Sequence, residues 1–306
     1  MQRVTQHSKI QLLLGSVQRS SASVASLQEQ LATGKQLNRP SDNPSGIART
    51  LRLRNELARC ESLSDRAAAA QSFLTMCESA LSSAQETLST AHQRAIAAVN
   101  GALGSDDLGA IADEINSSLE SLLDQARERY GDRYCFSGVD TLQDPFEVTR
   151  DSNGEITSIT YAGAPDAVTL DLGQGREIEI TVTGQEAFVD TGALSSLLNL
   201  RDTLRNTAGL DQASLSAAIR SAADCVDTAR KRVLELSGVM GGRQSRLDSI
   251  VERYETAIIE TKGLISKIED ADVAEVYTEL TSQQAVYNAL LSSSGKFFQQ
   301  SLFDYL

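Results

Sequence analysis

The two ends of the chain carry the pattern that most limits its fold, a thin apolar stripe with the alternating three- and four-residue spacing of a coiled coil. Near the N-terminus the stripe is interrupted only at Ser20, and its apolar members are Ile10, Leu13, Val17, Val24, Leu27 and Leu31. A helix with so narrow a stripe cannot build a core alone, because its other faces are polar or small. The N-terminal segment therefore needs a partner helix.

The same spacing returns at the other end of the chain. It runs through Val251, Tyr254, Ile258, Ile265 and Ile268, breaks at Glu269–Asp272, and resumes with Val276, Leu280, Tyr287, Leu290 and Phe297. Residues 1–40 hold five basic side chains and one acidic, whereas residues 264–306 hold two basic and six acidic. Because opposite charges favour pairing the two ends over self-pairing, the sequence predicts a coiled coil of N- and C-terminal helices.

Two stretches of this predicted coiled coil, residues 20–28 and 281–295, contain no charged residue. Their smooth Ala, Ser and Gln surfaces suit burial. Either the pair is an ordinary intramolecular coiled coil, or its outer faces are also covered by neighbouring copies in a polymer, and the pattern leaves both interpretations open. If neighbours are needed, we expect the isolated monomer to be protease-sensitive before Gly46 and after about Lys267.

Composition supports long helices and excludes several partners. The 306-residue chain is long enough for two or three domains, but it has no Trp and only 7 Phe and 7 Tyr. Its net charge of −13 argues against a nucleic acid or an anionic membrane as partner. No apolar run approaches the roughly 20 residues that span a bilayer. The short apolar block Leu12–Leu14 does not resemble a signal peptide, so we expect no cleaved leader.

Residues that usually carry chemistry are few and scattered. No C-x-x-C spacing occurs among the cysteines, which are Cys60, Cys77, Cys135 and Cys225. We expect the three in helical patterns to act as small apolar residues, and neither His7 nor His92 completes a zinc site. Acidic pairs such as Asp106–Asp107 suit a helix N-terminus. Without a protease, hydrolase or P-loop motif, we expect no enzyme, no cofactor and no metal.

The segment after the first helix predicts a rod. Asn43 can cap a helix that begins at Pro44, and an apolar helical pattern then continues to Asn100 without another proline or a glycine after Gly46. That is about 55 residues, far longer than a typical globular helix. A further helix, with Ser105 as its cap, should end near Tyr130.

A period change near residue 134 predicts a β-rich insert. Alternating segments at 147–149 and 156–161 flank Asp151-Ser152-Asn153-Gly154, a strong hairpin signal. Val168–Leu172 and Ile178–Val182 alternate around Gly173-Gln174-Gly175, so a second antiparallel pair is expected.

Two more helices are predicted after the insert, from Leu194 to Leu204 and from Asp211 to Val251. Gly238, Gly241 and Gly242 should each lower helix stability by about 1 kcal/mol relative to Ala. They mark either a loosened turn or a close approach of another backbone, and the sequence does not decide between them.

The predicted fold class is mainly α with a small antiparallel β insert. We expect three domains: a terminal coiled coil of residues 1–45 and 267–306, a helical rod of residues 46–133 and 195–266, and an outer insert of residues 134–194.

Two motifs resemble the signatures of bacterial flagellins and their relatives. The N-terminal one is Leu31-Ala32-Thr33-Gly34-Lys35 followed by Asn38-Arg39-Pro40-Ser41-Asp42-Asn43-Pro44-Ser45-Gly46, and the C-terminal one is Ile268-Glu269-Asp270-Ala271-Asp272-Val273-Ala274-Glu275. Each lies at its expected end, so the resemblance covers residues 1–135 and 195–306. Tyr134–Gly138 with Pro145–Phe146, and the terminus Ser301–Leu306, resemble the hook–filament junction branch of this superfamily. Cys135 departs from the aliphatic or aromatic residue expected there.

The resemblance implies a structural role in the bacterial flagellum. Flagellin-like proteins place their paired terminal helices in the inner layer of a tube, their middle helices around it, and the insert outside. The junction branch forms a ring of identical subunits that joins a FlgK-like hook-associated protein to the first flagellin. It also implies secretion by type III export, with a FlgN-like chaperone guarding the C-terminal helix. The apolar stripes and charge-poor faces then become subunit contacts.

Two alternatives remain open. A flagellin that polymerises into long filaments would share both motifs. A cytosolic coiled-coil adaptor or signalling protein would share the stripes, but it would form a stable cytosolic oligomer with ordered ends.

Overall fold

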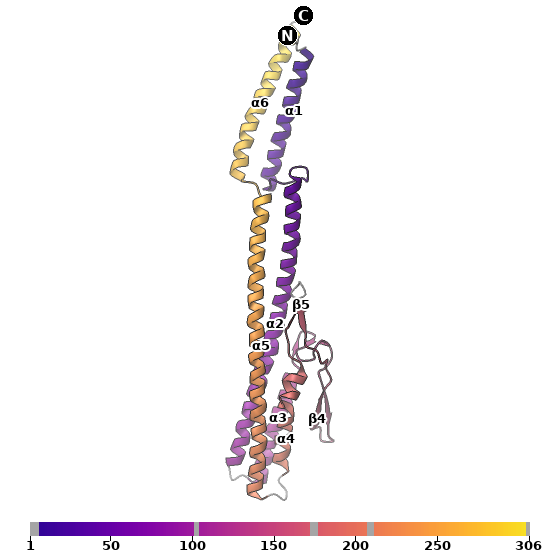
Figure 1. Ribbon diagram of the computed structural model, residues 1–306, viewed down its shortest axis with the longest axis vertical. Helices are drawn as coiled ribbons and strands as arrows, with labels where there is room; N and C mark the ends of the chain where they lie inside the picture. Colours follow the sequence, from indigo (N-terminus) through magenta and orange to yellow (C-terminus); the bar gives the residue numbers. More distant parts are fainter. Residues whose placement is uncertain (1–5, 101–103, 172–176, 207–210, 304–306) are drawn as a thin grey trace. The chain divides into compact units, whose positions relative to one another are not determined.

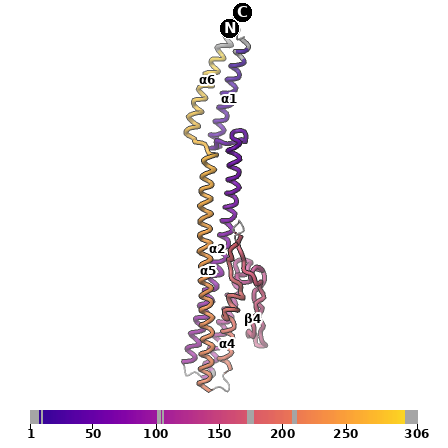
Figure 2. The backbone as a smooth tube through the Cα atoms, in the orientation of Figure 1, coloured from indigo at the N-terminus to yellow at the C-terminus, as the bar shows by residue number. Residues whose placement is uncertain are grey.

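The computed structural model describes residues 6–100, 104–171, 177–206 and 211–303. Figures 1 and 2 trace the chain from its N-terminus to its C-terminus. Its residues form two compact units. Residues 1–61 and 256–306 make up one unit, which we call the terminal unit, and residues 62–255 make up the other, the middle unit. Two long helices, α2 (Pro44–Asn100) and α5 (Gln212–Glu269), contribute residues to both.

The terminal unit is built on the pair of helices predicted from the stripes. Helix α1 (Gln6–Thr33) and helix α6 (Val273–Phe303) lie side by side and run in opposite directions (Figure 1). The buried side chains between them are Leu27, Val276 and Leu280, with Val24, Leu31 and Ala271 packed against these. The predicted pairing of the two chain ends is confirmed.

The middle unit contains the large apolar core. Helix α3 (Ser105–Ala126) packs on α4 (Ala193–Arg205), and both share one continuous cluster with α2 and α5. Polar contacts also join these helices. Gln71 Nε2 of α2 donates to the Asp248 carboxylate of α5, and Gln125 Nε2 of α3 donates to Thr87 Oγ1 of α2 at 3.0 Å. The largest buried side chains include Leu74, Leu81, Leu88, Ile115, Leu119 and Leu122.

Three two-stranded antiparallel sheets make up the insert's β structure: β1 (Arg129–Tyr130) with β2 (Arg133–Tyr134), β3 (Phe146–Arg150) with β4 (Ile156–Tyr161), and β5 (Thr169–Asp171) with β6 (Glu177–Glu179). The predicted hairpin at Asp151–Gly154 is present, because Asp151 Oδ1 accepts from the amides of Asn153 and Glu155, both at 2.9 Å. The predicted turn at Gly173–Gly175 lies outside the described residues. Phe136, Phe146 and Phe188 pack edge to face inside the same cluster as the helices.

The structure corrects several local predictions. Helix α3 ends at Ala126 rather than near Tyr130, because the chain enters β1 at Arg129 and then turns at Gly131 (φ 62°) into β2. Its N-cap is Gly104, and Ser105 is its first residue. Residues Gln185–Asp190, predicted to be part of the β-rich region, form a short π-helix, η1, that packs on α4.

The glycines of α5 are neither a loosened turn nor a close approach within the chain. The helix is continuous from Gln212 to Glu269, and a Cβ added at Gly238, Gly241 or Gly242 would meet no other heavy atom within 4 Å. Within the part of the chain that the structure describes, nothing requires glycine at these three positions.

The cysteines are all free thiols. Cys77 and Cys135 are buried and Cys60 is half-buried, but Cys225 is exposed on α5, so the expectation of an apolar core role is wrong for that residue.

Candidate functional site

The two flagellin-like motifs meet at one end of the α1–α6 pair. The first lies in the segment that joins α1 to α2, and the second lies where α5 ends and α6 begins. The two segments form an antiparallel bridge between Lys35 and Asp270. The Ala271 amide donates to the Gly34 carbonyl at 2.9 Å, and the Gln36 amide donates to the Glu269 carbonyl at 2.8 Å. We call these two segments, residues 34–46 and 268–272, the hinge.

Each helix end at the hinge is specified by a local residue. Gly34 ends α1 in the left-handed conformation (φ 69°), and its amide donates to the Gln30 carbonyl at 2.8 Å. Asn43 caps α2, since its Oδ1 accepts from the Gly46 amide at 2.9 Å and Pro44 is the first helical residue. Asp272 caps α6, because its Oδ1 accepts from the amides of Ala274 at 2.9 Å and Glu275 at 3.3 Å.

The loop between α1 and α2 is held by its own side chains. Asp42 Oδ2 accepts from the amides of Asn38 at 3.2 Å and Arg39 at 2.8 Å. Asn38 Nδ2 donates to the Lys35 carbonyl at 3.0 Å, and Arg39 pairs with Glu29 at 2.9 Å. Ser41 contacts only the neighbouring Asp42, with its hydroxyl 3.4 Å from Oδ1. These polar motif residues stabilise the loop.

Position 46 has no room for a side chain, so it requires glycine. A Cβ at this position would lie 2.9 Å from the Asn43 side chain and 3.1 Å from Leu37 Cδ1. The first contact would push against the side chain that caps α2, so a larger residue would disturb the start of the helix.

At the hinge, the carboxylate of Glu269 binds two positively charged side chains. Its carboxylate accepts from Lys35 Nζ at 2.6 Å and from Arg54 Nη2 at 2.6 and 2.7 Å, while the residue is only 7% exposed. Burial alone raises the pKa of this carboxyl group, but the hydrogen bonds from Lys35 and Arg54 outweigh it and hold the pKa below the ordinary value of 4.5. The cluster ties α2, the loop and the end of α5 together.

The sequence did not predict this ion cluster. Arg54 is 215 residues from Glu269 and is one of several arginines at the start of α2, so no local signal distinguishes it. Among the acidic residues of the C-terminal motif, Asp270 and Asp272 were the ones predicted to be functional. Asp272 caps a helix, and Asp270 accepts from Ser266 Oγ at 2.5 Å.

The predicted stripe residues of α1 and α6 whose side chains the structure describes are buried or half-buried. Leu27, Val276 and Leu280 are buried, and the half-buried members are Leu13, Val17, Val24, Leu31, Tyr287 and Leu290. The side chains of Ile10 and Phe297 lie outside the described residues. Ser20 fills its stripe position at 7% exposure, and its hydroxyl has no hydrogen-bond partner within the described structure.

The outer faces of the same pair leave large apolar side chains in solvent. Leu12 is 63% exposed, Tyr277 is 59% exposed, and Leu14, Val273, Val286 and Leu291 are also exposed. These exposed apolar side chains on both helices are available for contact with another protein.

The described residues contain no grouping of His, Cys, Asp and Glu suited to a metal ion. None of the helices, where the structure describes them, is both long and apolar enough to cross a bilayer.

Family comparison identifies the two ends. Residues 6–141 match the bacterial flagellin N-terminal helical region, and residues 223–306 match the bacterial flagellin C-terminal helical region. The chain belongs to the bacterial flagellin family. The matched regions contain α1, α6 and the whole hinge, so the predicted resemblance is confirmed.

Relatives within the flagellin family span nearly the full chain. Flagellar hook-associated protein 3 of Salmonella typhimurium is 24% identical over 299 residues, which are 90% of each protein. A flagellin of Listeria innocua is 24% identical over 279 residues, 87% of this chain and 85% of its own. The crystal structure of the flagellar junction protein FlgL from Legionella pneumophila has the same fold, with a TM-score of 0.58, 14% identity and coverage of 72% of this chain and 99% of that one.

Proposed function

We propose that this chain is a structural subunit of the bacterial flagellum that forms the hook–filament junction. The observation that carries the proposal is the pair of terminal helices, which belong to the flagellin family and leave apolar side chains exposed on both α1 and α6. A soluble monomer gains nothing from such a surface, whereas a subunit of a tube buries it against its neighbours. The similarity to hook-associated protein 3 over 90% of the chain favours the junction.

In this role the stripe residues hold α1 and α6 together within one subunit, and the outer faces contact adjacent subunits. The hinge sets the direction in which the pair leaves α2 and α5. The partners are further copies in a ring, a FlgK-like hook-associated protein on one side and flagellin on the other. We further propose that the chain is exported unfolded, guarded beforehand by a FlgN-like chaperone. Its final location is then extracellular, at the hook–filament junction.

Deletion of the gene, followed by electron microscopy of the cell surface, tests this function. We expect hooks that carry no filament, with flagellin released into the medium, and restoration of filaments by the plasmid-borne gene. Filaments that persist on the deletion strain would contradict the proposal.

A filament flagellin is the second candidate, because flagellins are also relatives across most of the chain. Purified protein distinguishes the two. A filament subunit extends into long polymers by itself, whereas a junction subunit stays monomeric and adds only to hook tips.

A further inference from the structure

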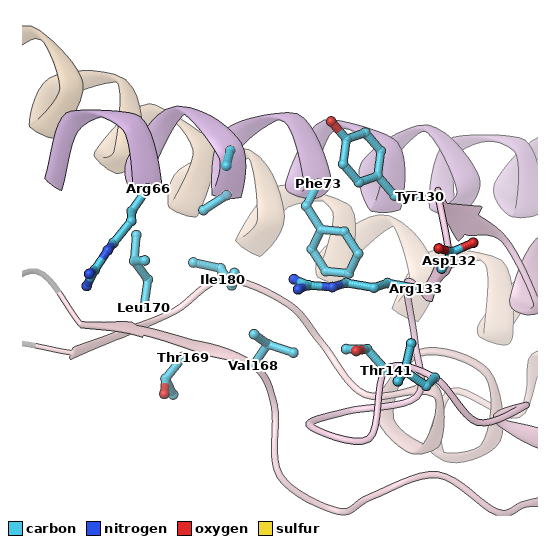
Figure 3. Close-up of a pocket in the computed structure, with 13 residues that line it drawn as sticks. Arg66, Phe73, Tyr130, Asp132, Arg133, Thr141, Val168, Thr169, Leu170 and Ile180 are labelled. Carbon is cyan, nitrogen blue, oxygen red and sulfur yellow. The ribbon is translucent and has the colours of Figure 1, made fainter. Parts of the chain in front are cut away.

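The middle unit contains a groove that the proposed function does not use. Its volume is about 640 Å³, and it lies between α2 on one side and Val168–Leu170 with Ile180 on the other (Figure 3). Phe73, Leu170 and Ile180 supply apolar parts of its lining, which also includes polar and charged side chains. All of these residues belong to residues 62–255.

Two exposed apolar side chains belong to the lining of the groove. Leu142 is 71% exposed and Tyr130 is 46% exposed. Solvated apolar groups beside an apolar groove indicate a surface that binds another protein.

The groove also carries unpaired positive charge. Arg66 reaches into it from α2, and Arg133 crosses it below Phe73 (Figure 3). Neither guanidinium forms an ion pair with any residue that the structure describes, whereas Asp132 supplies the one carboxylate in the lining. The groove therefore carries two positive charges beside apolar side chains, although the chain as a whole has a net charge of −13. Such a surface is complementary to an acidic segment that also carries an apolar side chain.

The short helix η1 (Gln185–Asp190) presents such a segment. Glu186 and Asp190 are exposed and four residues apart, so they lie on one side of the turn, and Val189 beside them is 37% exposed. Glu186 forms no ion pair within the described part of the chain. The Leu234–Val239 stretch of α5 also exposes apolar side chains, but it places only the Glu235 carboxylate beside them, whereas η1 offers two carboxylates for the two arginines.

We propose that the groove binds the Glu186–Asp190 segment of a second copy of this chain, with Arg66 and Arg133 facing the two carboxylates and Val189 entering the apolar space. This inference rests on the proposed function, which brings copies together. Because the groove and the segment are different surfaces, the contact is head to tail, and repetition around a rotation axis closes a ring.

Photo-cross-linking in cells tests the proposal. The substitution Leu142→p-benzoylphenylalanine is introduced into the plasmid-borne gene in the deletion strain, and cross-linked peptides are identified by mass spectrometry. We expect the substituted residue to join the peptide that contains Glu186–Asp190 of another copy. The same substitution at Leu234, which is 48% exposed in the same unit, is the matched control and should not join that peptide.

A charge exchange tests the electrostatic part. The double variant Arg66→Glu/Arg133→Glu, and separately Glu186→Arg/Asp190→Arg, should each lower the cross-link yield about tenfold, and combining both pairs should restore it. Circular dichroism of each purified variant checks that the fold is kept.

Cross-links from residue 142 to flagellin, to a hook protein, to another segment of this chain, or to nothing would overturn the docking proposal. The deletion phenotype is separate. Cells that make filaments with the substituted protein but give no such cross-link refute the docking alone, whereas filaments without the gene refute the proposed function.

Discussion

The terminal and middle units use the same kind of long, Ala- and Ser-rich helix, but they bury very different amounts of apolar surface. Among the described residues of the terminal unit, the buried apolar side chains are Leu27, Val276 and Leu280. In the middle unit the core continues along four helices and into the insert. The difference lies in the number of neighbours, because the extensive helix contact of α1 within the described residues is with α6. Composition alone therefore does not decide how much apolar surface a unit buries.

The largest loss of stability should follow a substitution in the apolar core of the middle unit. Leu119 is fully buried, so Leu119→Ala should lower the free energy of unfolding of the middle unit by about 3–4 kcal/mol. Leu14→Ala, at a side chain that is 51% exposed in the terminal unit, should change it by less than about 0.5 kcal/mol in the monomer. Urea unfolding followed by circular dichroism measures both. Equal losses would mean that the two units share one cooperative core.

The hinge should be the most sensitive part of the terminal unit. Glu269→Gln leaves Lys35 and Arg54 without their carboxylate and should cost about 2 kcal/mol. Limited proteolysis should then cut residues 34–46 faster than in the natural chain. Glu61→Gln removes a surface pair with Lys262, whose partners are 44% and 58% exposed, and should have little effect. Similar cleavage of both variants would contradict a special role for Glu269.

Acid should lower the stability of the two units over different pH ranges. The pKa of Glu269 is lowered in the folded chain, so its contribution is present above the unfolded value near 4.5 and is lost as the pH falls through the folded value. In the middle unit, hydrogen bonds from Lys231 and Arg230 lower the pKa of Asp227 to about 2, so its contribution persists until the pH approaches that value. Between pH 5 and pH 3, the protection of amides from hydrogen exchange, relative to the intrinsic rate at each pH, should fall first in residues 34–46. In Glu269→Gln that fall in protection should disappear.

Two glycines should respond in opposite directions. Gly46→Ala forces a contact at 2.9 Å on the Asn43 cap and should destabilise the start of α2 by about 1 kcal/mol. Gly242→Ala meets open space in the middle of α5 and should stabilise that helix by about 1 kcal/mol. Thermal unfolding of the two variants measures both signs. A loss of stability in Gly242→Ala would reveal a backbone contact that the monomer does not show.

The smallest expected change is at Ser20. Its buried hydroxyl has no partner within the described structure, so Ser20→Ala should stabilise the α1–α6 pair by up to about 1 kcal/mol. The protease resistance of α1 measures the gain. Weaker assembly in the same variant would indicate that the polar group sets the register of the pair.

Local signals predicted much of the fold and part of the site. The stripes predicted the α1–α6 pair, Asn43-Pro44 predicted the start of α2, and Asp151–Gly154 predicted the hairpin, because each depends on residues close in sequence. The expected three-domain division stays a prediction. The end of α3 was missed because no proline or glycine follows Ala126 until Gly131, whereas the strand pairing of Arg129–Tyr134 ends the helix earlier.

The sequence by itself determined that the two ends are thin-striped helices, oppositely charged, interrupted by capped breaks, and carrying flagellin motifs. Only the tertiary structure decided that Arg54 and Lys35 share Glu269, that three glycines of α5 face open space, and that Arg66 and Arg133 enter one groove. Helix periodicity and capping are set by neighbours within a few residues. Ion clusters and grooves depend on side chains brought together from distant parts of the chain, and those distances exist only after folding.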